Sequence, residues 1–122
     1  MTDQEINEAV GRKLGWELIA SDKPGYAPLW SDPQHGGQRS QWGPEFPIDY
    51  CHSIAAAWEI VEYLFLKKIG FIIEECKDRD TNERWFLVTF TTYLSYGQPQ
   101  FTVKETADNA PMAICRAFLK LL

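Results

Sequence analysis

Apolar residues recur at helical spacing near the start of the chain. Ile6, Val10 and Leu14 lie one helical turn apart, so they would share one face of a helix. Asp3 can cap the start of this helix, and Gly15 can end it. The pattern predicts a short first helix with a narrow face to bury. Such a helix has little propensity to spare, so we expect it to depend on packing against the rest of the protein.

The same periodicity returns in the middle of the chain and at its end. Ser53 is a good N-cap for a helix that Gly70 ends at its C′ position. Near the end, Asp108 or Asn109 can cap a helix with Pro111 in its first turn, where a missing amide hydrogen costs nothing. We therefore expect a central core helix and a terminal helix. Their apolar stripes contain Ile54, Ala57, Trp58, Val61, Leu64 and Phe65 in the former, and Ile114, Cys115, Phe118, Leu119 and Leu122 in the latter.

Three segments between these two helices have the composition of β-strands. They span residues 71–76, 84–92 and 100–104, and an antiparallel meander is their simplest pairing. In the middle segment, the side chains that alternate to the two faces of the sheet are apolar on both faces, and one of these sets contains Trp85 and Leu87. Neither face of the sheet can therefore be fully exposed to water. The predicted fold class is α+β, an antiparallel β-sheet of three to five strands with α-helices packed on both faces, which is an α-β-α sandwich.

A further hairpin is expected earlier in the chain. Residues 16–20 and 26–30 can form two short strands around the Pro24-Gly25 turn. Pro28 lacks an amide hydrogen, so the second strand would lie at an edge or be irregular.

Regular periodicity is lost at about 31–49, where prolines and glycines break every pattern. This stretch is predicted to be a long irregular loop without regular elements. Burial of Trp42 and Phe46 would offset only part of the entropy lost on ordering it, so we expect a loop held at its aromatic residues and mobile at residues 34–38. No repeat or linker divides the chain, and residues 1–122 are interpreted as a single domain.

Composition narrows the function classes. The chain has 122 residues, a formal charge of −5 and a pI near 5.0, which argues against direct nucleic-acid binding because that requires cationic side chains. No apolar run approaches the ~20 residues that span a bilayer, and Met1-Thr2-Asp3-Gln4-Glu5 lacks the features of a secretion signal. We expect a protein of the host-cell cytoplasm without a membrane partner. There, Cys51, Cys76 and Cys115 would stay as thiols.

Two segments carry a family resemblance. The run from Tyr50 to Val61 and the closing run from Ala110 to Ala117, with Glu5 to Val10 and Leu14-Gly15-Trp16 before them, cover about a third of the chain. In this order they resemble the phage ABA sandwich domain family of small phage and prophage proteins. The resemblance implies a helix and sheet sandwich and an accessory phage gene. The family has no assigned catalytic residues, so the resemblance implies no site.

Candidates for chemistry are few. Cys51 and His52 are adjacent, so their side chains point apart, whereas catalytic pairs of this type usually meet through the fold. With His35 they are also too few to form a metal site without a spaced carboxylate or a second cysteine. We expect no catalytic residues, no metal and no cofactor. Cys51 and His52 are attributed to local packing and helix capping.

The aromatic residues of the long loop region are the only feature of that region that indicates a binding function. Trp and Tyr are frequent at interaction hot spots, and long loops in small domains are commonly functional. The alternative is that these rings simply pack the loop onto the sheet. The predicted binding residues are Tyr26, Trp30, His35, Trp42 and Tyr50.

The leading functional hypothesis is a non-enzymatic phage or prophage accessory protein that acts by binding, with inhibition of a host defence protein as its mode of action. A second hypothesis is the sequestration of a small, nucleotide-like ligand, with a homodimer as one way to form the site. A structural, self-assembling phage protein is the third, and an enzyme of unrecognised type stays open.

Overall fold

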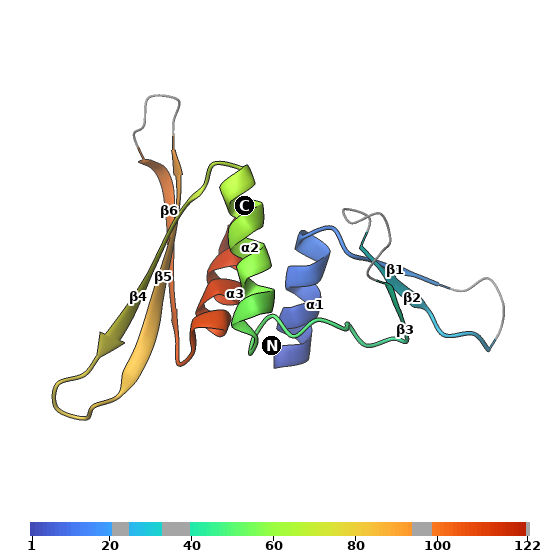
Figure 1. The fold of residues 1–122 in the computed structure, drawn as a ribbon, viewed down its shortest axis with the longest axis horizontal. Coiled ribbons are helices and arrows are strands. Elements are labelled where there is room, and N and C mark those ends of the chain that lie inside the picture. The colour runs from blue at the N-terminus through green and yellow to red at the C-terminus, as the bar shows by residue number, and fades with distance from the viewer. Residues whose placement is uncertain (21–24, 33–39, 94–98, 122) are drawn as a thin grey trace. The chain divides into compact units, whose positions relative to one another are not determined.

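The computed structural model describes residues 1–20, 25–32, 40–93 and 99–121 (Figure 1). The chain forms two compact units, Met1–Asp49 and Tyr50–Leu122. A single domain over 1–122 stays a prediction, because two compact units can belong to one domain. The elements are α1 (Asp3–Lys13), β1 (Glu17–Ile19), β2 (Leu29–Ser31), β3 (Ser40–Trp42), α2 (Ile54–Leu66), β4 (Gly70–Lys77), β5 (Arg84–Tyr93), β6 (Pro99–Ala107) and α3 (Ala110–Lys120).

Helix α1 of the first unit begins at Asp3, the residue expected to be its cap, and so starts one residue earlier than predicted. Thr2, and not Asp3, is the N-cap: its hydroxyl accepts from the Glu5 amide at 3.2 Å, and its own amide donates to the Glu5 carboxylate at 3.3 Å. This reciprocal capping box satisfies two amides that a helix start leaves open. The hydrogen bond from the Thr2 backbone lowers the pKa of Glu5 below its ordinary value.

The first unit also contains a small antiparallel sheet in the order β1-β2-β3. The pairing of β1 with β2 confirms the early hairpin. The prediction that 31–49 holds no regular element is wrong, because β3 pairs along the whole of β2. Local sequence misses β3 because its hydrogen-bond partners are distant in the chain, as when the Gly43 amide donates to the Pro28 carbonyl at 2.8 Å. The expected mobile tip at 34–38 lies outside the described residues.

An aromatic cluster joins the segment after β3 to α1. The buried Phe46 ring meets Trp16 at 5.3 Å and Trp30 at 5.1 Å, both edge to face. The same ring lies directly against Gly11 of α1: a Cβ at that position would be 2.9 Å from one ring carbon of Phe46 and closer still to two others. Gly11, which weakens the helix by propensity, is therefore required by close packing.

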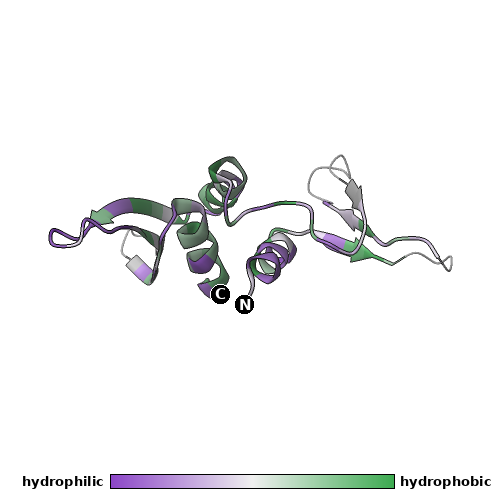
Figure 2. Cartoon of the chain, turned by 90° about the horizontal axis from the view of Figure 1, so that it is seen from below, coloured by the Kyte–Doolittle hydropathy of each residue, from purple (hydrophilic) through white to green (hydrophobic). Residues whose placement is uncertain are grey.

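The second unit contains the three-stranded antiparallel meander that the sequence predicts. The order is β4-β5-β6, with Phe71 opposite Phe90 and Phe90 opposite Val103. The strands extend beyond their expected ends. Figure 2 shows that the body of the sheet is hydrophobic and that the tip of the β4–β5 hairpin is hydrophilic. The α+β fold with a three-stranded antiparallel sheet is thus confirmed.

The helices of this unit begin where their capping residues predict. Ser53 accepts from the Ala56 amide at 3.2 Å, and Asn109 accepts from the Met112 amide at 2.7 Å. Their placement differs from the expected two-sided cover, because α2 and α3 lie on the same side of the sheet (Figure 1). They bury the set of strand residues that contains Val88 and Phe90.

We expect Gly11→Ala to destabilise the protein by about 1–3 kcal/mol, because the new methyl group would overlap the Phe46 ring in a closed core. Urea denaturation followed by far-UV circular dichroism measures the change in the free energy of unfolding.

Gly70→Ala is the matched control. Its Cβ would approach the Tyr93 ring at 2.8 Å, but Tyr93 is 49% exposed and can swing away. The control should therefore unfold within about 0.5 kcal/mol of the parent. Equal stability of the two variants would show that Phe46 does not close on α1 as described.

Candidate functional site

The structure distributes the five predicted binding residues over different environments. Tyr26 is 65% exposed and Trp42 68% exposed, both in the first unit. Trp30, in the same unit, has no exposed surface. Tyr50 is also fully buried, but it belongs to the second unit, where its hydroxyl donates to the Glu59 carboxylate at 3.4 Å. His35 lies outside the described residues.

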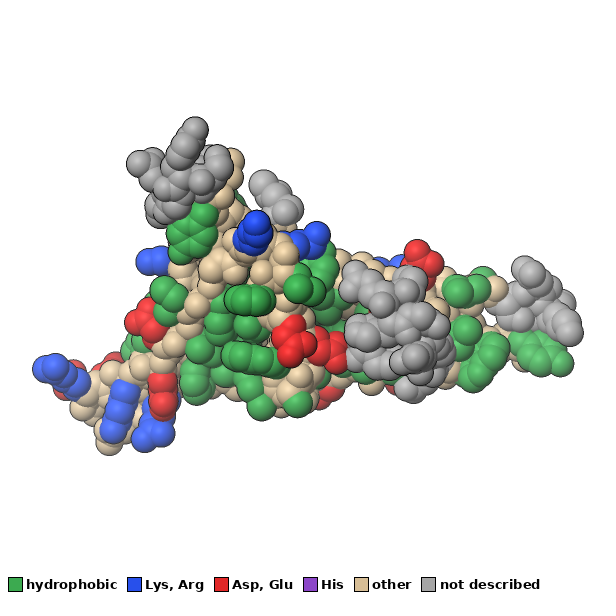
Figure 3. Space-filling view, turned by 45° about the horizontal axis from the view of Figure 1, so that its top comes forward, with side chains coloured by type: hydrophobic (Ala, Val, Ile, Leu, Met, Phe, Trp, Pro, Cys, Tyr) green, Lys and Arg blue, Asp and Glu red, His purple; other side chains and the backbone are tan. Residues whose placement is uncertain are grey.

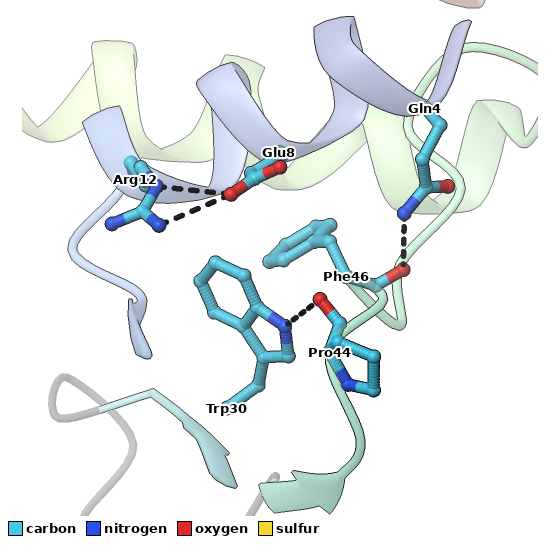
Figure 4. A network of polar contacts seen from close by, with 6 residues as sticks. All are labelled: Gln4, Glu8, Arg12, Trp30, Pro44 and Phe46. Atoms are coloured by element: carbon cyan, nitrogen blue, oxygen red, sulfur yellow. Dashed lines mark hydrogen bonds and ion pairs between the residues drawn. The ribbon is translucent and has the colours of Figure 1, made fainter. Parts of the chain in front are cut away.

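Trp30 is a core anchor of the first unit (Figure 4). Its indole N–H donates to the Pro44 carbonyl at 3.2 Å, and its ring lies 5.0 Å below the guanidinium carbon of Arg12. Arg12 is held in turn by an ion pair with Glu8 at 3.1 Å. Trp30 therefore ties the segment after β3 to α1, and the packing interpretation of this ring holds.

Trp42 lies on the opposite face of the same small sheet. The register places Ile19 opposite Leu29, and Leu29 opposite Trp42. Directly paired residues share a face, and Leu29 is adjacent to Trp30 in the strand, so these three side chains point away from the buried ring. We call Ile19, Leu29 and Trp42 the outer row.

The outer row is an apolar surface left open to solvent. Ile19 is 50% exposed and Trp42 68% exposed, while Leu29 between them is half-buried. The neighbouring pair on this face is polar, with Glu17 opposite Ser31. An aromatic anchor beside aliphatic side chains and a polar margin has the composition of a protein-binding hot spot.

Sequence reasoning found one member of the outer row and missed the other two. The sequence indicates Trp42 as an aromatic residue of the long loop, and it places Ile19 and Leu29 only in the early hairpin. Their alternation with polar neighbours indicated strands, but the register that joins them to Trp42 required β3.

The burial of Cys51 agrees with its attribution to local packing, and the role of His52 stays a prediction. Cys51 is fully buried, His52 is exposed, and Ser53 after them caps α2. Within the described ranges, no three His, Cys, Asp or Glu side chains come together in a way that could hold a metal ion.

The second unit exposes apolar side chains of its own. Helix α2 has a second apolar stripe beside its buried one, with Trp58 47% exposed and Phe65 78% exposed. Figure 3 shows hydrophobic side chains gathered on the helical side and charged ones at the hairpin tip. A hollow of about 400 Å³ lies at one end of the sheet, lined by Ile69, Thr92, Gln100, Phe101 and Leu121.

Comparisons with protein-family models, with curated proteins and with solved structures find no match to this chain. The resemblance to the phage ABA sandwich domain family therefore stays a prediction. None of the helices in the described part of the chain has the length and apolar character needed to cross a membrane.

Truncation of the two tryptophans of the small sheet should change the free energy of unfolding by very different amounts. Trp30→Ala removes a buried ring and its hydrogen bond, and we expect a loss of about 3–5 kcal/mol. Trp42→Ala removes a ring that is mostly in water, and we expect a change within about 0.5 kcal/mol. Urea titrations followed by circular dichroism compare them. A large loss for Trp42→Ala would mean that this ring is structural.

Proposed function

We propose that this chain is a non-enzymatic phage or prophage accessory protein that binds and inhibits a host protein, with the outer row as its contact surface. The single observation that carries the binding role is the outer row itself. Exposed apolar residues on a small protein are usually scattered, whereas these three align across three paired strands.

The shape of the outer row favours a macromolecular partner over a small ligand. Neighbouring strands lie about 4.8 Å apart, so the row is about 10 Å from its first strand to its third. A row on an open sheet face is not concave, whereas sites for small ligands generally are. A protein segment laid across β1, β2 and β3 would cover the row completely.

Charge suggests the kind of protein surface that fits. The chain carries a formal charge of −5, and Glu17 lies beside the apolar residues on the same face. A basic margin on the partner would complement this carboxylate and speed the encounter. Occupying a basic groove of a host protein is a means of inhibition, and the family resemblance supports a phage origin.

Site-specific photocrosslinking in bacterial cells tests the contact surface. A photoreactive phenylalanine analogue placed at Trp42 should give a discrete covalent adduct with one host protein, because the ring at this position would lie within the interface. The same analogue at the exposed Glu83, on the β4–β5 hairpin, serves as the control and should give no such adduct.

A second variant connects the adduct to the outer row. Ile19→Ser in the protein carrying the analogue at position 42 should lower the adduct yield about tenfold, since it removes the aliphatic end of the row. An adduct at Glu83 equal to that at Trp42, or a yield unaffected by Ile19→Ser, would exclude the row as the binding surface.

A further inference from the structure

The sheet of the second unit has one face that α2 and α3 do not cover. Residues directly opposite one another share a face, so the register assigns each side chain to one side or the other. Val88 and Phe90 face the helices, and their neighbours along β5 face the other way. We call this side the open face; it comprises Ile72, Glu74 and Cys76 of β4, Trp85, Leu87, Thr89, Thr91 and Tyr93 of β5, and Thr102, Lys104 and Thr106 of β6.

The open face is apolar on the half of its central strand that lies nearest the β4–β5 hairpin. Trp85 and Leu87 on the central strand are half-buried, Thr89 after them is buried, and Ile72 on β4 is 56% exposed. Tyr93, 49% exposed, lies on the same side, since its ring covers the position of a Cβ on Gly70. A strand that is apolar on both sides is typical of a sheet with both faces covered. Here, among the described elements of the unit, only α2 and α3 pack on the sheet, and both lie on its other face.

The charges of the open face are divided between its two edges. Glu74 on β4 is paired through Leu87 with Thr106 on β6. Ile72 on β4 is paired through Thr89 with Lys104 on β6. One edge strand therefore presents a carboxylate and the other an ammonium group, in adjacent rows.

We propose that a second copy of this chain covers the open face, sheet against sheet, about a two-fold axis that runs parallel to the strands. This axis places β4 of each copy over β6 of the other, and the two β5 strands over each other. Trp85 and Leu87 of both copies then meet along the axis and form the apolar part of the interface. Glu74 of each copy comes beside Lys104 of the other, so two ion pairs flank the apolar part.

Charge selects this axis over the other two-fold arrangement of facing sheets. An axis perpendicular to the strands would place β4 over β4 and β6 over β6. The two Glu74 carboxylates would then lie on one side of the interface and the two Lys104 groups on the other, which is repulsive. Only the parallel axis makes the open face complementary to itself.

The area is sufficient for a reversible dimer. Strands of eight to ten residues, rising about 3.4 Å per residue and about 4.8 Å apart, give a face of about 30 by 14 Å. Because side chains make the accessible surface larger than this flat area, two copies would together bury on the order of 1,000 Å² of accessible surface, near the lower limit of specific interfaces. We therefore expect dissociation on dilution, which sedimentation velocity over a concentration series measures.

Leu87→Thr tests the apolar part of the interface while preserving a side chain suited to a strand. It should raise the dimer dissociation constant at least about tenfold, because Leu87 lies near the axis in both copies. Phe65→Ser is the matched control: it removes an equally apolar side chain, 78% exposed, from α2 on the helical side. The control should leave the dissociation constant unchanged.

Charge exchange tests the axis without altering the apolar part of the interface. Glu74→Lys alone and Lys104→Glu alone should each weaken the dimer, since each places like charges side by side across the interface. The double variant should restore the parental dissociation constant. This readout remains informative if Leu87→Thr fails to fold, and circular dichroism verifies the fold of each variant.

Three outcomes would overturn the proposal. One is a monomer at every concentration. Another is a dimer that Phe65→Ser disrupts and Leu87→Thr does not, which would place the contact on α2. The third is a double charge variant weaker than either single one. None of these outcomes concerns the outer row, so the binding role above is tested independently.

Discussion

The alternation of side chains along a β-strand is the constraint from which both surfaces of this protein follow. Side chains alternate between the two faces of each sheet, and in the second unit α2 and α3 cover only one of these faces. In the first unit this sends Trp30 inward and Leu29 outward from adjacent positions. In the second it buries Val88 and leaves Leu87 facing outward.

Rigid cores support these open faces. The Phe46 ring meets two tryptophans edge to face and lies against Gly11, so the segment after β3 is fixed on α1. In the second unit, the Trp58 ring of α2 similarly meets the Phe71 ring of β4 edge to face, with the ring centroids 6.0 Å apart. Because aromatic packing of this kind is directional, each sheet is held in one orientation relative to its helices. A surface on a sheet held in this way is preorganised, which lowers the entropy cost of binding.

The two open faces have different chemistry, and this difference separates their proposed roles. The outer row is a single line of apolar residues beside the Glu17 carboxylate. The open face of the larger sheet carries apolar residues on its central strand and opposite charges on its two edges, which is the requirement for self-association. The proposed binding to another protein and the proposed pairing with a second copy are therefore assigned to separate units of one chain.

The sequence by itself determined the local structure: the caps at Ser53 and Asn109, the three long strands and the α+β class all follow from periodicity and capping chemistry within a few residues. It also selected Trp42 as a surface candidate, but it could not separate that ring from Trp30, since both are tryptophans in an aromatic stretch. Only the tertiary structure decided this, through the pairing of β3 with β2. In the second unit it likewise decided that both helices lie on one face of the sheet. Pairing between distant segments sets the register, and the register decides which side chains are buried.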